Sequence, residues 1–287
     1  MAEFEQVRYS TRDHIATITL HRPEARNAAT PQMLDELVAA FDRTDNDDSV
    51  RCVVVTGSGD DFCVGADLAA LRGIQEQRDP NSVEVDEDPG GRVALRIFRS
   101  LKPVIAAING PAVGVGLTMT LPMDFRLATD RARFGFVFAR RGILLEAGSG
   151  WFLPRLVGIS QAAEWVYSGR VFPAAEALDG GLLRSVHPAA ELVPRAYALA
   201  AEIANNCAPL SVALSRQMLW RMLTAPDPMS AHVAASRALN ILGGSADARE
   251  GIASFLEKRP PRFTGSVSTD LPDIFGGSPP GWALDPA

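Results

Sequence analysis

The chain has 287 residues, of which 47% are hydrophobic and 22% are charged; this composition excludes a mainly disordered chain and supplies enough apolar material for a substantial core. The net charge of −6 provides no positive excess to attract a phosphate backbone, which excludes nucleic acid as the main partner. The length fits a main domain with a smaller appendage.

The cysteines and the first residues indicate the compartment. Cys52, Cys63 and Cys207 form no CxxC pair and are not the even number of a secreted disulfide framework. We therefore expect three small buried thiols in a reducing environment. The sequence starts with an acidic segment and lacks the apolar stretch of a secretory signal, so we expect a cytoplasmic protein.

The first hundred residues alternate between strand and helix patterns. A strand is predicted over 15–20, a helix over 31–45 and a second strand over 51–56. The second strand is apolar on both faces, which is typical of a strand covered on both sides. Residues 72–92 hold six acidic residues among prolines and glycines, and we expect most of this segment to be a solvated loop.

The middle of the chain continues this pattern. A buried strand is predicted over 104–108, a buried helix over 114–125 and a further helix from 151. The segment 103–123 is uncharged and nominally long enough to cross a bilayer. Its prolines and glycines break it into shorter elements, so we expect no contact with a membrane.

Strand patterns end before Leu192, and helical spacing follows. One predicted apolar stripe contains Leu192 and Ala196, and the next contains Leu214 and Leu219. We therefore expect a strand-and-helix core over 1–195, a helical subdomain over 196–263 and an irregular tail over 264–287 that is rich in glycine and proline.

Several common cofactor and nucleophile motifs are missing from the sequence. The glycines at 114 and 116 lack the third glycine of a dinucleotide fingerprint, and there is no Walker loop. The segment 147–150 is not a nucleophile elbow, because Ala147 stands where the spacing requires glycine. The four histidines have no paired metal spacing. We expect no metal and no cofactor.

Two turns built of small residues follow buried strands, at 62–68 and at 109–116. Small residues let a ligand approach the backbone closely, and the first N–H groups of a helix are unpaired and carry a positive dipole. If N–H groups of both turns converge, they form an oxyanion hole. Taken singly, each turn is better explained as a tight turn with close packing.

Four segments, 21–28, 53–68, 103–124 and 146–158, together resemble the crotonase superfamily, also called the enoyl-CoA hydratase/isomerase family, and the resemblance runs from about residue 5 to 263. It implies an α/β fold: a crotonase-like superhelix of repeated ββα units with a helical C-terminal trimerisation subdomain. It further implies a homo-oligomer, either a trimer or a dimer of trimers. The implied substrate is an acyl-CoA thioester, with coenzyme A as part of the substrate rather than a cofactor.

The resemblance also implies the binding residues. Two backbone N–H groups, which match Ala66 and Val115 by position, would polarise the thioester carbonyl. The loop around Ala25 and Arg26 would bracket the CoA nucleotide. The remaining CoA-binding candidates flank the oxyanion turn or lie in the C-terminal helix of a neighbouring subunit, and they are Val64, Leu68, Phe255 and Lys258.

The acid–base residue distinguishes the reactions that members of the family catalyse. Hydratases of the family use two glutamates, and the matching positions here are Thr118 and Phe138. Glu146 falls where isomerases and other branches carry an acidic base. Neighbouring apolar residues would raise the pKa of Glu146, whereas a nearby helix start would oppose this change. Its alternative role is that of a helix-entry carboxylate stabilised by the dipole. The acyl-pocket candidates are Thr118, Phe138, Arg141 and Trp151.

Arg141 and Trp151 also have structural explanations, as an ion-paired or solvated arginine and as a core aromatic residue. The sequence therefore predicts an enoyl-CoA isomerase or an atypical hydratase with Glu146 as acid and base. Two alternatives remain open. One is a catalytically disabled protein that binds acyl-CoA, and the other is a hydrolase of thioester or C–C bonds on the same fold.

Overall fold

The computed structural model describes residues 4–69 and 87–276. The chain divides into two compact units, the first reaching Asn205 and the second starting at Asn206. The division lies later than the boundary predicted after residue 195, because that position falls inside a helix that packs on the sheet of the first unit. Most of the predicted loop at 72–92 lies outside the described residues, but a helix already begins at Pro89.

The first unit is built on a six-stranded sheet in the order β1-β2-β3-β4-β6-β9. Strand β1 is antiparallel to β2, and each later pair is parallel. Parallel strands that are covered on both faces consist of continuous apolar runs, and β4 is buried along its whole length. The strands are β1 (Val7–Arg12), β2 (Ile15–Leu20), β3 (Cys52–Gly57), β4 (Val104–Ile108), β6 (Phe125–Thr129) and β9 (Ser185–His187).

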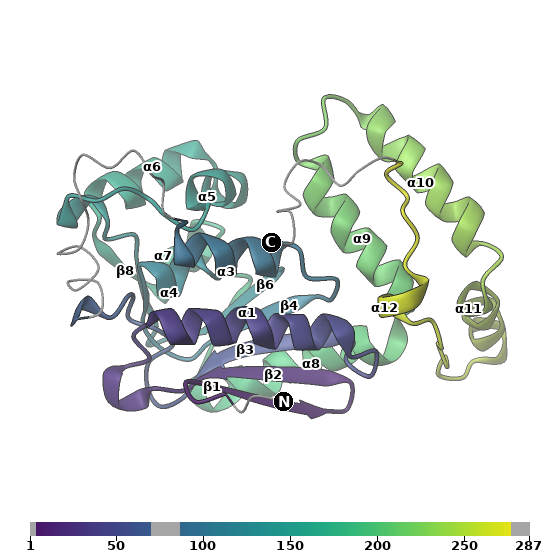
Figure 1. Cartoon of the computed structure of the whole chain (residues 1–287), viewed down its shortest axis with the longest axis horizontal. Coiled ribbons are helices and arrows are strands. Elements are labelled where there is room, and N and C mark those ends of the chain that lie inside the picture. The colour runs from purple at the N-terminus through teal and green to yellow at the C-terminus, as the bar shows by residue number, and fades with distance from the viewer. Residues whose placement is uncertain (1–3, 70–86, 277–287) are drawn as a thin grey trace. The chain divides into compact units, whose positions relative to one another are not determined.

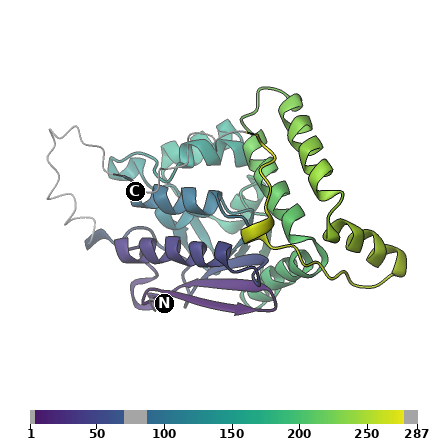
Figure 2. The same cartoon turned by 45° about the vertical axis from the view of Figure 1, so that its right-hand side comes forward.

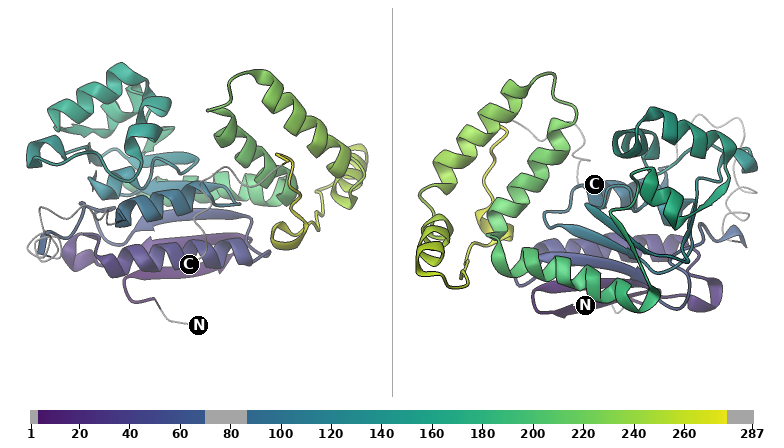
Figure 3. Two further views of the ribbon diagram at one scale, coloured as in Figure 1. Left: turned by 45° about the horizontal axis from the view of Figure 1, so that its top comes forward. Right: turned by 180° about the vertical axis from the view of Figure 1, so that it is seen from behind.

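Helices cover both faces of this sheet. Helices α1 (Pro31–Asn46) and α3 (Pro89–Phe98) contact each other and run side by side over one face (Figures 1 and 2). On the other face, α8 (Ala189–Asn206) lies across the strands, as the right-hand view of Figure 3 shows. Its buried alanines, 196, 200 and 204, are small enough to bring the helix close to β2, β3 and β4. The sheet and these helices form the main core.

The rest of the first unit consists of short elements. A second sheet holds β5 (Ala112–Val113), β7 (Arg133–Gly135) and β8 (Val171–Pro173). The helices are α4 (Val115–Thr118), α5 (Ser149–Val157), α6 (Ile159–Ser168) and α7 (Ala174–Asp179), with two 3-10 turns, η1 (Pro23–Ala25) and η2 (Ala139–Arg141). Repetition of strand, turn and helix matches the α/β crotonase fold that the resemblance implied.

The predicted helix over 114–125 is wrong in length. Helix α4 covers only Val115–Thr118, and the chain then makes turns before Phe125 enters β6 beside Ile105. Pro122 cannot donate to a helix. The Asp124 carboxylate accepts a hydrogen bond of 2.8 Å from the Val104 N–H, which joins this turn to the start of β4.

The second unit is helical within its described residues. It contains α9 (Pro209–Met222), α10 (Pro228–Leu242), α11 (Ala246–Glu257) and the one-turn α12 (Val267–Asp270). Leu214, Ala234 and Ile274 form its core cluster. The predicted irregular tail thus includes a helical turn and the buried Ile274, while residues 277–287 lie outside the described residues.

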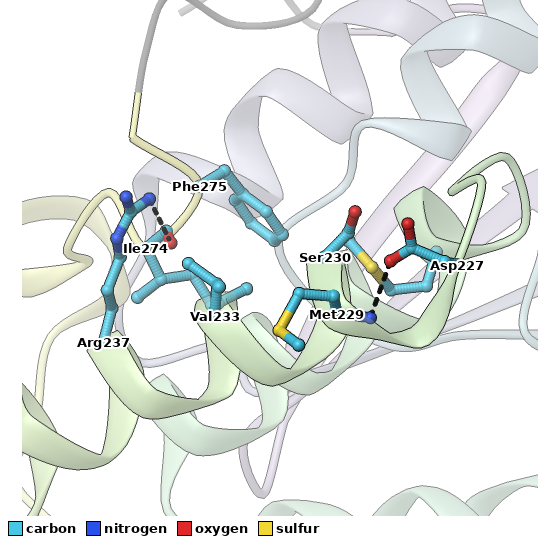
Figure 4. A pocket seen from close by; sticks show the side chains of 9 residues that line it. Asp227, Met229, Ser230, Val233, Arg237, Ile274 and Phe275 are labelled. Atoms are coloured by element: carbon cyan, nitrogen blue, oxygen red, sulfur yellow. Dashed lines mark hydrogen bonds between the residues drawn. The ribbon is translucent and has the colours of Figure 1, made fainter.

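One expectation for the second unit is wrong, because Cys207 is exposed, although Cys52 and Cys63 are buried as expected. Leu219, on the predicted apolar stripe, lies on α9 with an exposed fraction of 75%. The unit also contains an open groove of about 440 Å³ that Met222, Val233, Arg237 and Phe275 help to line (Figure 4). The predicted site residues do not line it. Within the described part of the chain, no helix is both long and apolar enough to span a bilayer.

Candidate active site

The two small-residue turns of the first unit lie against each other. The Val113 N–H donates to the Cys63 carbonyl at 3.0 Å, and the Cys63 N–H donates to the Pro111 carbonyl at 3.0 Å. A side chain on Gly116 would collide with that same Cys63 carbonyl, so glycine is what allows the approach. The structure therefore brings together the turns that the sequence marked separately.

Each turn leaves one backbone N–H available. Gly65 and Gly114 have φ angles of +107° and +54°, a region that favours glycine, and the following residues are Ala66 and Val115. Among the described residues, neither of these two N–H groups donates a hydrogen bond. Val115 is the first residue of α4, where helical N–H groups have no partner within the helix. Both groups are free to bind an acceptor.

Glu146 lies between η2 and α5, with its carboxyl group directed at α4. Its Oε1 accepts a hydrogen bond from the Thr118 hydroxyl, while its Oε2 accepts none from the described residues. The pKa of Glu146 is raised to about 7, chiefly by burial; the hydrogen bond from Thr118 lowers it and the charge of Asp88 contributes to the rise. A carboxyl group with such a pKa can both take and return a proton near neutral pH.

The surroundings of Glu146 place it beside the second turn. A methyl group on Gly90 would collide with Glu146 Oε2 and would lie 3.0 Å from Val115 Cγ2. Both side chains therefore border the same glycine at the start of α3. Glu146 is thus brought next to Val115 and Thr118, which belong to a different predicted segment. The pKa of Glu146 agrees in direction with the expected desolvation.

Two residues of this neighbourhood were missed by sequence reasoning, namely Asp88 and Gly90. They fall in the acidic segment that was expected to be a loop. An aspartate followed by proline is a typical helix start, with the acid as N-cap and proline at the first helical position. That signal is present at Asp88 and Pro89, and it marks the beginning of α3.

The predicted CoA-binding loop is well ordered by hydrogen bonds. Ala25 ends η1, and Arg26 adopts a left-handed conformation with φ of +55°. The Arg26 guanidinium binds both oxygens of Asp61, at 2.8 and 3.0 Å. Buried Asn27 donates to the carbonyls of Ser58 and Asp61, which fixes this loop against the turn that follows β3.

The other predicted residues have varied environments. Val64 is half-buried and Leu68 is exposed. Phe138 is buried, whereas Arg141 is exposed. Trp151 is half-buried rather than a core residue; it packs edge-on against Phe98 at 5.7 Å, and Arg155 lies over its ring. Phe255, with an exposed fraction of 82%, lies on α11 of the second unit, and Lys258 follows as the C-cap.

Among residues 4–69 and 87–276, no group of three or more histidine, cysteine, aspartate or glutamate side chains has the arrangement to hold a metal ion. The groups that the described residues bring to the site are a carboxyl group, a hydroxyl group and two backbone N–H groups.

Comparison with known proteins identifies the family. The model for enoyl-CoA hydratase/isomerase matches residues 10–266. The chain is 45% identical over 253 residues to the enoyl-CoA hydratase ACTT3 of Alternaria alternata, which covers 88% of this chain and 83% of that protein. It is 32% identical over 255 residues to the 1,2-epoxyphenylacetyl-CoA isomerase of Escherichia coli (strain K12), covering 88% and 95% of the two chains.

A solved structure agrees with these relatives. The crystal structure of an enoyl-CoA hydratase from Bacillus anthracis superposes with a TM-score of 0.83 at 29% identity, over 91% of this chain and 100% of that one. The fold, the matched residues and the paired turns thus agree, and the chain belongs to the enoyl-CoA hydratase/isomerase family of the crotonase superfamily.

Proposed function

We propose that the protein acts on an acyl-CoA thioester through an enolate, with Glu146 moving the proton and the N–H groups of Ala66 and Val115 binding the thioester oxygen. Coenzyme A enters as part of the substrate, and no further cofactor is required. The observation that carries the proposal is Glu146 itself, a half-buried carboxyl group with a pKa raised to about 7 that lies beside the turn of Val115.

The chemistry follows from these groups. Removal of a proton next to a thioester places negative charge on the carbonyl oxygen, and fixed N–H groups stabilise that charge without having to reorient. Glu146 Oε2 accepts the proton while Thr118 holds Oε1. Glu146 then gives a proton to another carbon of the conjugated system, which moves the double bond, so that one C–H bond is broken and one is formed. Exchange of the proton on Glu146 with solvent before this second step introduces deuterium in D₂O.

Isomerisation needs one such carboxyl group, whereas the family's usual hydration uses two glutamates. Thr118 and Phe138 stand at the positions that the resemblance assigns to those glutamates. We therefore favour a 1,3-shift of the double bond, and hydration would require water to be positioned in another way. The printed names of the relatives include both a hydratase and an isomerase.

The remaining assignments complete the proposed binding mode. Ala25, Arg26, Val64 and Leu68 would contact the CoA portion, with Phe255 and Lys258 supplied by a neighbouring subunit of a trimer or hexamer. Phe138, Arg141 and Trp151 would line the acyl pocket together with Thr118. Because Arg26 already binds the Asp61 carboxylate, a CoA phosphate would have to share this guanidinium with it.

The experiment is deuterium exchange measured by mass spectrometry. Saturated and unsaturated acyl-CoA esters of increasing length are incubated in D₂O with wild-type protein, Glu146→Gln or Glu202→Gln. Glu202 is an exposed glutamate on α8 and serves as the matched control. We expect deuterium in the acyl chain with the wild type and with Glu202→Gln, and at least a 100-fold slower exchange with Glu146→Gln, since general acid–base catalysis contributes about 10²–10⁴-fold.

Other outcomes contradict the proposal in different ways. Full exchange by Glu146→Gln would show that another group is the base. Acyl-CoA binding without exchange or turnover would favour a binding protein, which the absence of both hydratase glutamates makes the second candidate. Release of free CoA or cleavage of the acyl group would instead indicate a hydrolase.

A further inference from the structure

Asp88 connects the start of helix α3 to the backbone beside Glu146. Its Oδ1 accepts a hydrogen bond of 2.9 Å from the Gly90 N–H, which caps the helix. Its Oδ2 accepts a hydrogen bond of 2.7 Å from the Ala147 N–H. One carboxylate oxygen thus binds the first turn of α3, and the other binds the backbone of Ala147, the residue next to Glu146.

The backbone at this point requires such support. Ala147 has a φ of +56°, a left-handed conformation that alanine adopts only when its surroundings hold it there. The Ser149 N–H and hydroxyl both donate to the Glu146 carbonyl, at 3.0 and 2.5 Å. Asp88 and Ser149 thus hold the N–H and the carbonyl of one peptide group, the one that joins Glu146 to Ala147.

The same contact fixes the space in front of the Glu146 carboxyl group. By joining α3 to this segment, Asp88 places Gly90 against Glu146 Oε2 and Val115 Cγ2. Thr118 holds the other oxygen of Glu146 from α4. Glu146 is thereby held by its backbone from α3 and by its side chain from α4, with one carboxyl oxygen left for chemistry.

Asp88 also acts on Glu146 through its charge. Helix α4 faces Glu146 with the uncharged segment 115–118, Arg92 of α3 pairs with Asp35, and Arg155 of α5 lies over Trp151. Asp88 is the like charge that raises the pKa of Glu146 in addition to burial.

We propose that Asp88 is the positioning residue of this site: it ties the first turn of α3 to the peptide beside Glu146 and so sets the geometry of the acid–base group. This inference rests on the proposed function of Glu146. The role assigned to Asp88 is structural, since its two oxygens accept hydrogen bonds from the backbone of two different segments.

The test is an infrared titration of the Glu146 carboxyl group, which needs no substrate. The band is assigned by its loss in Glu146→Gln and is followed against pH in the wild type, in Asp88→Asn and in Asp88→Ser. Serine can still cap the helix but is too short to reach the Ala147 N–H as well. Asp88→Ser therefore removes the contact with Ala147 while it keeps the helix cap. Asp227→Asn is the matched control, because Asp227 caps α10 through a 2.8 Å bond from the Met229 N–H.

We expect the titration midpoint of Glu146 to fall in both Asp88 variants and to stay unchanged in Asp227→Asn. With the acyl-CoA ester that exchanges fastest in the D₂O panel, kcat should fall about 10-fold or more while KM changes less than about twofold, because the geometry of the reacting group is lost rather than substrate binding. If Asp88→Asn folds poorly, the same measurements on Asp88→Ser test the inference.

An unchanged Glu146 midpoint together with an unchanged kcat in folded Asp88 variants would overturn the inference. A rise of KM with an unchanged kcat in both Asp88 variants would also overturn it, since that result would place Asp88 in substrate binding. Failure of the proposed function gives a different result. It would appear as full deuterium exchange by Glu146→Gln in D₂O, a measurement that does not involve Asp88.

Discussion

Burial changes the acid–base behaviour of one carboxyl group, that of Glu146. Its ordinary pKa of 4.5 is raised to about 7, chiefly because the charged form loses hydration, and the hydrogen bond from Thr118 only partly opposes this. The resemblance to the crotonase superfamily selected this residue, and its apolar neighbours in the chain predicted the direction of the pKa shift. Of these neighbours, Ile143 and Leu144 are exposed in the structure, so the burial of Glu146 comes from other contacts. Sequence reasoning could not identify Thr118 as the hydrogen-bond donor to Glu146, since that contact joins residues on different elements.

The raised pKa has a consequence for stability. Between pH 4.5 and about 7 the folded chain keeps a proton on Glu146 that the unfolded chain releases, so the free energy of unfolding should fall as pH rises through this window. The fall is at most about 3.5 kcal/mol, since one pKa unit corresponds to about 1.4 kcal/mol. Glu146→Gln should remove this pH dependence and make the protein more stable than the wild type at pH 8.

Urea unfolding at fixed protein concentration, at pH 5 and pH 8, measures this effect. Glu202→Gln is again the control, because an exposed carboxyl group should leave the slope with pH unchanged. An identical pH dependence in wild type and Glu146→Gln would mean that Glu146 titrates normally.

At the scale of elements, the start of α3 decides the shape of the site. The helix begins at Pro89 with Asp88 as its N-cap, and its glycine at 90 lies against the carboxyl group of Glu146. The acidic composition of 72–92 favours a loop. This prediction is wrong for the end of the segment, where α3 begins at Pro89. The contact that stabilises this helix start comes from Ala147, a residue far along the chain.

Gly90→Ala should therefore impair catalysis more than folding. The added methyl group would displace Glu146 Oε2 and press on Val115, and misplacement of a reacting group by about 1 Å can cost about 10²-fold in rate. We expect such a fall of kcat in the D₂O exchange assay, with an unchanged far-UV circular dichroism spectrum.

Gly150→Ala is the matched control for this prediction. Gly150 lies in the first turn of α5, and a methyl group there would have no neighbour within 4 Å. Alanine should be tolerated or slightly stabilising at that position. Equal activity of the Gly90 and Gly150 variants would contradict the close approach of α3 to Glu146.

At the scale of the whole molecule, the described helices of the second unit expose large apolar side chains to solvent. Those with exposed fractions above 70% are Leu219, Leu239, Phe255 and Leu256. Exposed apolar surface of this extent is typical of interaction sites, and the resemblance to crotonases implies a subunit interface in this region. We expect a homotrimer or a dimer of trimers.

Sedimentation velocity tests this expectation. Wild-type protein should sediment as a trimer or hexamer, and Leu239→Glu combined with Leu219→Glu should shift the mass toward the monomer, since a charge would replace buried apolar surface. A monomeric wild type at micromolar concentration would contradict the assembly and, with it, the contribution of Phe255 and Lys258 from a neighbouring subunit.

The sequence by itself determined the type and place of the elements whose pattern is local. The strands over 15–20 and 104–108 have the predicted bounds, because continuous or alternating apolar residues specify a strand without reference to distant contacts. The order of four short motifs was sufficient to identify the family and its α/β superhelix, and it selected Ala66, Val115 and Glu146 as candidates.

Only the tertiary structure decided which segments meet. Helix α8 belongs to the first unit because its alanines fit the sheet, although its periodicity alone resembled that of the helices that follow. Asp88 and Gly90 acquire their place beside Glu146 through a hydrogen bond between positions 59 residues apart. Such contacts are set by packing and by the pairing of buried polar groups, which depend on the whole fold and leave no signal within a short stretch of sequence.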